Sequence, residues 1–224
     1  MKEDKTKGEA YLKGYFLFLI FVCAFFPFYE KGGFEVLINT VHNPLLDQFF
    51  VCITQLGDGV MLIFPILIML FIRYSYAIFL ALSTIIHILF VHLGKRVFFP
   101  GMPRPVEFLS GIELHIVPGV SMHHWNTFPS GHTTSIFMLT CAVAILSPKQ
   151  KALQLLVLVI AILTGFSRIY LMQHFLIDVV VGSFLGVVAA YSGRWMTIRF
   201  FSKKKFRKSL LSNRKRKMAR PIME

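Results

Sequence analysis

The sequence predicts an all-α integral membrane protein, a bundle of six transmembrane helices. Of its 224 residues, 55% are hydrophobic and only 16% are charged, and the mean hydropathy is +0.65. Soluble domains of this length are rarely so apolar, and about 25% of their residues are charged. The few charges are unevenly spaced, so they leave six long uncharged runs. These runs approach the ~20 residues that a helix needs to cross a bilayer.

The six predicted helices follow the uncharged runs in chain order. The third run is the clearest, because its 21 residues suffice to cross a bilayer. The other runs are shorter, and we expect polar residues at the membrane–water boundary to complete them. The second run extends backward through Gly57 and Asp58, and Asp178 and Arg194 bound the last one. The runs are residues 14–29, 59–72, 74–94, 132–147, 152–167 and 179–193.

Two segments between these helices have a composition of their own. Residues 33–50 place apolar residues among polar ones, which predicts an amphipathic helix at the membrane surface, interrupted at Pro44. Residues 95–129 form a loop rich in Pro and Gly, in which residues 111–119 could form a short strand. Loops of this length are uncommon unless they bind a substrate or act as a lid. We therefore expect this loop to carry part of a functional site.

The positive charge predicts the orientation of the chain. Residues 199–224 hold eleven Lys or Arg residues against one acid, Glu224. An even number of spans puts both termini on one side, and the excess of basic residues makes that side the cytoplasm. The chain thus divides into a six-helix membrane domain, residues 1–198, and a basic cytoplasmic tail, residues 199–224, expected to be disordered. Because the tail follows an apolar segment, its predicted partners are anionic lipid headgroups and not nucleic acid.

Three short strings carry side chains suited to phosphoryl transfer, and the last of them runs from Ser167-Arg168 to His174 and Asp178. Residues four apart share one face of a helix, so Asp178 can hold one imidazole nitrogen of His174 and raise the basicity of the other. Arg168 can bind phosphate oxygens through two parallel hydrogen bonds. An isolated pair of this kind would be interpreted as an ion pair at a helix end.

The second string, Pro129-Ser130-Gly131-His132, predicts the start of a helix that faces an anion. Ser130 is a good N-cap, and Gly131 lets the backbone approach a phosphate closely. His132, in the first turn, can protonate a leaving oxygen. By itself this string would indicate an ordinary helix cap.

The first string supplies cations at the start of the long loop. They are Lys95 and Arg96, followed by Arg104 on a segment stiffened by proline. Basic side chains at a membrane boundary often only reach toward water. All three strings in this order, however, supply what a metal-free phosphoryl-transfer site needs: cations, a nucleophile, an orienting acid and a proton donor. The predicted active-site loop, residues 95–129, lies outside the cytoplasm.

Other polar residues give weaker signals. Asp58 either caps the second helix or faces the site. His87 and His92 in the third helix are interpreted as polar packing residues. A metal site in the long loop is a minor alternative, because no carboxylate or cysteine stands at ligand spacing from its histidines, which are His115, His123 and His124. Three cysteines in apolar runs are interpreted as small buried hydrophobes: Cys23, Cys52 and Cys141.

These strings resemble the signature of the type 2 phosphatidic acid phosphatase (PAP2) superfamily over residues 50–195. The second and third strings match it in residue type and spacing. The first departs from it, because eight residues separate Lys95 from Arg104 and seven separate Arg96 from Arg104, more than is usual in the family. Whether Lys95 or Arg96 takes the family lysine's role is open, and we favour Lys95.

The resemblance implies a role for each residue. His174 attacks phosphorus and forms a phosphohistidine, Asp178 orients it, and His132 protonates the leaving group and then activates water. The phosphoryl oxygens are held without a metal or other cofactor, by Lys95, Arg104, Ser130, Gly131 and Arg168.

The predicted activity is that of a lipid phosphate or diphosphate phosphatase in a bacterial inner membrane. The short loops, the small single domain and the absence of an Asn-x-Ser/Thr acceptor favour this location. The family implies four substrate classes: undecaprenyl diphosphate, lipid A phosphates, phosphatidylglycerol phosphate and phosphatidic acid. A site outside the cytoplasm favours the first two. Two alternatives stay open, a lipid phosphotransferase with the same site and a non-catalytic transporter or scaffold.

Overall fold

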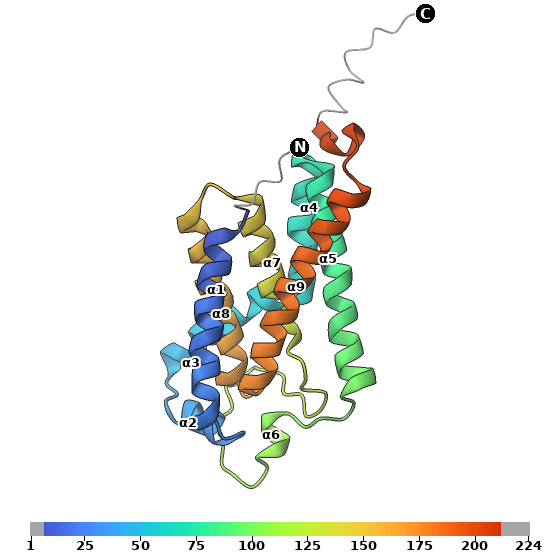
Figure 1. Cartoon of the computed structure of the whole chain (residues 1–224). Helices are drawn as coiled ribbons and strands as arrows, with labels where there is room; N and C mark the ends of the chain where they lie inside the picture. Colours follow the sequence, from blue (N-terminus) through green and yellow to red (C-terminus); the bar gives the residue numbers. More distant parts are fainter. Residues whose placement is uncertain (1–6, 212–224) are drawn as a thin grey trace, which may run out of the picture.

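A computed structural model describes residues 7–211 as helices joined by turns and one long loop (Figure 1). The nine α-helices within these residues are α1 (Glu9–Phe25), α2 (Gly33–Thr40), α3 (Pro44–Thr54), α4 (Ile63–Ile72), α5 (Tyr74–Leu93), α6 (Pro105–Phe108), α7 (Gly131–Leu146), α8 (Lys151–Tyr170) and α9 (Leu176–Phe200). A π-helix, Gly94–Phe98, prolongs α5. The short 3-10 helices are Phe26–Phe28, Gln55–Gly57, Gly59–Leu62 and Lys204–Arg207.

The long helices lie side by side, and the chain begins and ends at the same end of the bundle (Figure 1). We call this end, where α1 starts and α9 finishes, the terminal end. The opposite end, where α8 finishes and α9 starts, carries the long loop and is called the site end. No strand occurs among residues 7–211, so the strand considered for residues 111–119 is not formed. The loop has one isolated bridge, between Pro103 and Trp125.

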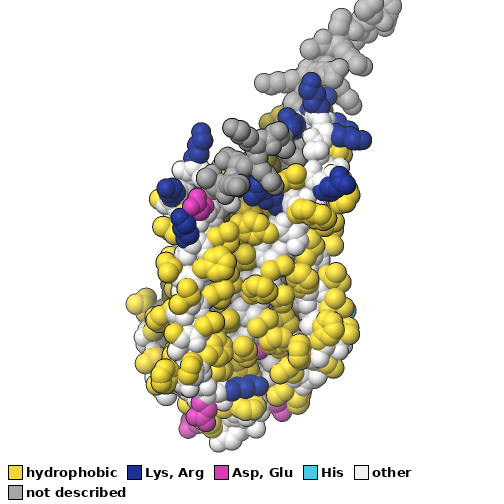
Figure 2. All heavy atoms as spheres, in the orientation of Figure 1, with side chains coloured by type: hydrophobic (Ala, Val, Ile, Leu, Met, Phe, Trp, Pro, Cys, Tyr) yellow, Lys and Arg dark blue, Asp and Glu magenta, His cyan; other side chains and the backbone are white. Residues whose placement is uncertain are grey.

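Four helical segments are long and apolar enough to cross a membrane: Glu9–Phe28, Tyr74–Phe98, Lys151–Tyr170 and Leu176–Phe200. The bent pair Pro44–Gly57 and Gly59–Ile72 makes a fifth if it is counted as one span, and α7 is shorter. Hydrophobic side chains cover the middle of the visible face, and Lys and Arg gather mainly at the terminal end (Figure 2). The prediction of an all-α membrane protein is therefore confirmed, with four or five candidate spans, while the count of six stays a prediction.

The second predicted span differs from the structure. Its apolar run, residues 59–72, is not one straight helix. The preceding segment, residues 33–50, lies in two helices, α2 and α3, with the interruption expected at Pro44. That segment divides at Asn43, whose side chain accepts the N–H of Leu46, and α3 starts at Pro44. The helices on either side of Asp58 meet at 50°. Asp58 accepts the N–H of Val60 and so caps the second half, and it also lies close enough to His132 and Arg168 to interact with them electrostatically.

Helix α7 lies at the centre and packs most closely on α9. The approach requires glycine on α9: a Cβ on Gly182 would lie 2.8 Å from the carbonyl oxygen of Ser130, and one on Gly186 would lie 2.6 Å from that of Thr134. Such backbone proximity is typical of small residues at helix interfaces in membranes. Because Ser130 starts α7, the same contact sets the position of the predicted phosphate-binding turn.

Helix α9 continues to Phe200, beyond the run of residues 179–193 from which it was predicted. Arg194 and Trp195 therefore belong to the helix itself. After α9 the chain turns back, and the carbonyl of Lys208 accepts the N–H of Tyr74 at the start of α5. Disorder was predicted for the whole basic tail, residues 199–224, but the structure describes residues 199–211, where α9 ends at Phe200 and a 3-10 helix covers Lys204–Arg207. Residues 212–224 lie outside the described residues.

Candidate active site

His174 and Asp178 meet at the junction between α8 and α9. Nδ1 of His174 lies 3.3 Å from Oδ2 of Asp178, and both side chains are at most 2% exposed. The two do not share a helical face as their spacing predicts, because α9 begins only at Leu176. Instead, Asp178 folds back from the first turn and accepts the N–H of Phe175 at 2.9 Å. This cap, favoured by the positive helix end, fixes the carboxylate against the imidazole.

Thr127 from the long loop joins this pair, and no motif in the sequence indicates it. Its buried hydroxyl donates to Oδ2 of Asp178 and lies 3.2 Å from Nδ1 of His174. Since the Thr127 proton is used on Asp178, the Thr127 oxygen can only accept from His174. The ring proton is therefore assigned to Nδ1, and the lone pair of His174 stands on Nε2.

His174 is neutral in this setting. Burial, and after it the positive charges of Arg104 and Lys95, lower the pKa of His174 well below its ordinary value. A neutral imidazole with a free lone pair is the form in which histidine attacks phosphorus. The environment thus favours the neutral form of His174 and the tautomer with its lone pair on Nε2.

Two of the predicted cations are held by neutral acceptors. Lys95, in the π-helix, donates from Nζ to the carbonyl of Asn126 at 2.7 Å. Arg104 donates from Nε to the carbonyl of Trp125 at 3.1 Å and from Nη1 to Oε1 of Gln173 at 3.0 Å. Neither forms a salt bridge within residues 7–211. Their charge is therefore available to an anionic ligand.

Arg168, at the end of α8, has a donor without a partner. Its Nη1 donates to Oγ1 of Thr54 at 2.8 Å, but its buried Nε finds no acceptor among the described residues. Leaving a buried donor unpaired costs about 1–3 kcal/mol, and more when the group is charged. An oxyanion placed beside Arg168 would satisfy Nε.

The structure distinguishes Lys95 from its neighbour. Lys95 is partly buried and lies close enough to Asp178, Arg104 and Arg168 to interact with them electrostatically. Arg96 is exposed. Of the two candidates for the family lysine, only Lys95 faces the site.

The start of α7 points its free amides toward the same region. Ser130 is fully buried, and its Oγ accepts the hydroxyl of Thr133 at 2.8 Å, so its own proton remains available to a ligand. Its N–H donates to the backbone carbonyl of Asp178 at 3.1 Å, which ties the second string to the third. The first hydrogen bond within the helix runs from the N–H of Thr134 to the carbonyl of Ser130. The N–H groups of Gly131 and His132 come before it, so they have no acceptor within the helix. Such amides bind anions.

His132 lies in the first turn of α7, partly buried, and interacts electrostatically with His174, Arg168 and Asp58. The break in the α3–α4 segment packs on it closely, since a Cβ on Gly57 would lie 2.9 Å from its carbonyl oxygen. The structure therefore gathers all eight residues proposed from the sequence at one site: Lys95, Arg104, Ser130, Gly131, His132, Arg168, His174 and Asp178.

Glu35 on α2 is a second residue that the sequence reasoning missed. It is fully buried, and Oε1 accepts the hydroxyl of Tyr29 at 2.9 Å and the N–H of Leu176 at 2.8 Å. Oε2 accepts the N–H of Gly32 at 2.8 Å. Glu35 thereby caps the start of α9 next to His174. Burial, and after it the charge of Glu35, raise the pKa of Tyr29, so the phenol remains a donor.

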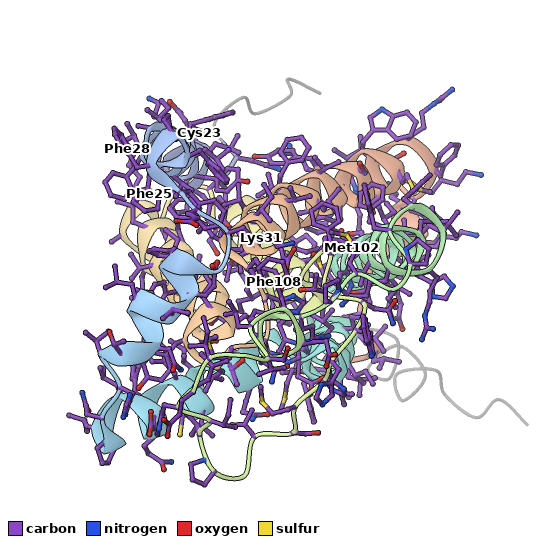
Figure 3. All side chains as sticks on the ribbon, turned by 90° about the horizontal axis from the view of Figure 1, so that it is seen from below. Cys23, Phe25, Phe28, Lys31, Met102 and Phe108 are labelled. Atoms are coloured by element: carbon purple, nitrogen blue, oxygen red, sulfur yellow. The ribbon has the colours of Figure 1, made fainter. Side chains whose placement is uncertain are left out.

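Lys31 adds a cation above the start of α9. Its Nζ lies 4.4 Å from the centre of the Phe175 ring and 4.9 Å from that of Phe108. Seen from the site end, Lys31 and Phe108 lie together over the bundle, whereas Phe28 lies at its edge on the α1 side (Figure 3). The long loop and the turn after α1 therefore cover the site jointly.

The other histidines have separate partners. His115 pairs with Asp47 at 2.9 Å, and His124 pairs with Glu107 at 2.9 Å. His87 lies 3.1 Å from the hydroxyl of Ser135 inside the bundle. Among residues 7–211, no group of three or more His, Cys, Asp and Glu residues is placed to hold a metal ion.

Comparison with known proteins gives one family and two related structures. The model of the PAP2 superfamily matches residues 75–203. The crystal structure of Aquifex aeolicus LpxE has a TM-score of 0.61 and 32% sequence identity, over 72% of this chain and 93% of that one. The first transmembrane PAP2 type phosphatidylglycerolphosphate phosphatase from Bacillus subtilis has a TM-score of 0.53 and 21% identity, over 87% and 98%. No curated protein sequence matches.

Proposed function

Because the chain belongs to the PAP2 superfamily, we propose that this membrane phosphatase hydrolyses a phosphomonoester or diphosphate on a lipid headgroup through a phosphohistidine. One observation carries the proposal: a buried, neutral His174, with its lone pair assigned to Nε2, stands near three cations that form no salt bridge within residues 7–211. Charge binds the phosphate, and the fixed imidazole attacks it.

The steps balance as follows. Nε2 of His174 forms a bond to phosphorus as the bond from phosphorus to the lipid oxygen breaks. His132, whose protonated form is favoured by the negative charge of the bound phosphate, gives that oxygen its proton. Asp178 and Thr127 hold the Nδ1 side of the ring as it becomes positively charged. Water, deprotonated by His132, then attacks phosphorus, releases phosphate and restores the neutral His174. Lys95, Arg104 and Arg168 stabilise the charge on the phosphoryl oxygens throughout.

The proposed substrate is a lipid exposed on the outer leaflet of a bacterial inner membrane. The basic terminal end is placed in the cytoplasm by the excess of Lys and Arg there, so the site end faces outward. Undecaprenyl diphosphate and lipid A phosphates are presented on that side. Phosphatidylglycerol phosphate and phosphatidic acid are therefore less favoured.

The test is a substrate panel with the detergent-purified protein and its His174→Ala variant. The panel holds undecaprenyl diphosphate, lipid A bisphosphate, phosphatidylglycerol phosphate and phosphatidic acid, and free phosphate and lipid masses are measured. Phosphate release from one lipid, absent in the variant and unchanged in EDTA, is expected. A new phosphorylated lipid without free phosphate would indicate the phosphotransferase. No change in any lipid would favour the transporter or scaffold, and strict dependence on a metal would contradict the mechanism.

A further inference from the structure

A second cluster of cations lines a cavity at the terminal end, far along the bundle from His174. The cavity has a volume of about 350 Å³ and lies between α5, α7, α9 and the segment that follows α9. Its lining includes Lys7, Arg73, Arg194 and Arg207. Among the described residues that line it, none is an acid. Figure 2 shows dark blue side chains collected at this end, above the hydrophobic middle of the molecule.

The start of α5 adds to this positive potential. Arg73 is the N-cap position of α5, and no side chain among the described residues caps this end. The dipole of a 20-residue helix and the hydroxyl of Ser75 therefore face the cavity. Nη1 of Arg73 donates to the hydroxyl of Tyr76 at 3.3 Å, but its buried Nε has no acceptor within residues 7–211. As at Arg168, an oxyanion in the cavity would satisfy this donor.

The wall of the cavity distinguishes a lipid from a free ion. Beside the cations and the hydroxyls of Ser75, Thr197 and Ser202, the wall holds aromatic and aliphatic side chains such as Phe79, Ile145 and Ile198. Inorganic phosphate would use only the cations, whereas a phospholipid offers a phosphate to the cations and hydrocarbon to the wall. Cations that served only to orient the chain in the membrane would not need to line a cavity. Lys149 and Lys151, at the same end of the bundle, are exposed and do not line this cavity.

We propose that this cavity binds the phosphate of an anionic phospholipid from the leaflet at the terminal end. The site is separate from the catalytic one and does not depend on the proposed activity. It also differs from diffuse attraction to the basic tail, because it requires Arg73 and Arg194 in particular and a defined volume between helices.

The test is binding of phosphatidylglycerol, whose phosphodiester is not a phosphomonoester substrate. Full-length protein in detergent is titrated with this lipid, with phosphatidylcholine as the uncharged reference, and bound lipid is counted by native mass spectrometry. The variant R73Q/R194Q is expected to bind phosphatidylglycerol at least about tenfold more weakly, because it loses direct charge-assisted hydrogen bonds. The control K149Q/K151Q removes two cations from the same end and is expected to stay within about twofold.

Three outcomes would overturn the proposal. They are equal weakening in both double variants, undiminished binding by R73Q/R194Q, and displacement of the lipid by inorganic phosphate as readily as by more phosphatidylglycerol. Gel filtration and thermal unfolding in the same detergent check that each variant is folded. If R73Q/R194Q does not fold, the single variant R194Q replaces it, because no hydrogen bond holds the Arg194 side chain among residues 7–211. The proposal then requires that R194Q binds phosphatidylglycerol at least threefold more weakly than the unmodified protein.

Discussion

The site end and the terminal end both gather cations, in different surroundings. At the site end, Lys95, Arg104 and Arg168 surround the buried pair of His174 and Asp178. At the terminal end, the cations line a cavity without any acid or histidine among its described residues. Both ends contain an arginine whose Nε lacks an acceptor, so both have the means to bind an oxyanion. Among the described residues around the two groups of cations, histidine side chains occur only at the site end.

This difference separates recognition of a phosphate from its chemical transfer. Recognition needs positive charge and free donors, which a few basic side chains at a helix start supply. Transfer needs in addition a neutral nucleophile with a fixed tautomer, and that depends on buried contacts from three parts of the chain. Turnover should therefore fall most when the proposed nucleophile is removed, less when a cation that binds the phosphate is removed, and least when a group that only positions His174 is removed.

The largest effect is expected for His174→Ala. Turnover should fall at least about 10⁴-fold, because the nucleophile is lost while binding groups remain. Phosphate release is measured with the best lipid of the panel, and thermal unfolding is compared with that of the unmodified protein. His92→Ala, at an exposed position on α5, is the matched control and should keep full activity. A His174→Ala protein with near-normal turnover would rule out the phosphohistidine.

Arg104→Gln should lower kcat/KM about 100-fold at neutral pH, since a charge-assisted contact to the phosphate is lost. It should also move the acid limb of the pH profile. The positive charge of Arg104 helps to lower the pKa of His174. Without that charge the pKa of His174 rises, more of the imidazole is protonated at a given pH, and activity is lost from a higher pH. An acid limb that stays in place, measured on the same substrate, would show that His174 is not the group titrating.

Lys95→Gln and Arg96→Gln test the two neighbouring cations against each other. Lys95→Gln should lower kcat/KM about 30-fold, because its ammonium faces the site. Arg96→Gln also removes one positive charge, but from an exposed position, and should change kcat/KM less than about threefold. The reverse ranking, by steady-state kinetics, would assign the family lysine's role to Arg96.

Thr127→Val should lower kcat about tenfold with little change in KM, because Thr127 acts on Asp178 and His174 and not on the lipid. Thr127→Ser retains the hydroxyl and should stay within about twofold of the unmodified protein. This rescue separates positioning of the imidazole from simple packing. Equal losses in both variants would assign Thr127 a packing role only.

The sequence predicted the parts of the site that are local in the chain, and missed those that are not. Arg168, His174 and Asp178 are neighbours in one string and could be proposed together, although His174 and Asp178 meet through the cap at Phe175 and not on a shared helical face. Thr127 contacts Asp178 across 51 positions, and Glu35 contacts Leu176 across 141. No periodicity or motif encodes such pairs, because they arise only when α2 and the long loop pack against the start of α9.

The fold shows the same limit. Uncharged runs predicted the long helices, since hydrophobic length is a local property. They missed the bend at Asp58, where a capping carboxylate interrupts the segment, and they ended α9 early at Arg194, although helical hydrogen bonding continues through charged residues at a membrane boundary. The terminal cavity was also missed, because its cations come from four separate parts of the sequence.

The smallest effect on turnover is expected for R73Q/R194Q, and it tests the separation of the two ends most sharply. The variant should hydrolyse a detergent-dispersed substrate within about twofold of the unmodified rate, because its cations lie at the end of the bundle opposite His174 and touch no residue of the catalytic site. Initial rates at saturating lipid measure this, beside K149Q/K151Q. A loss of tenfold or more in a folded R73Q/R194Q protein would mean that the two cation clusters are coupled through α5 and α9, the helices that run from one to the other.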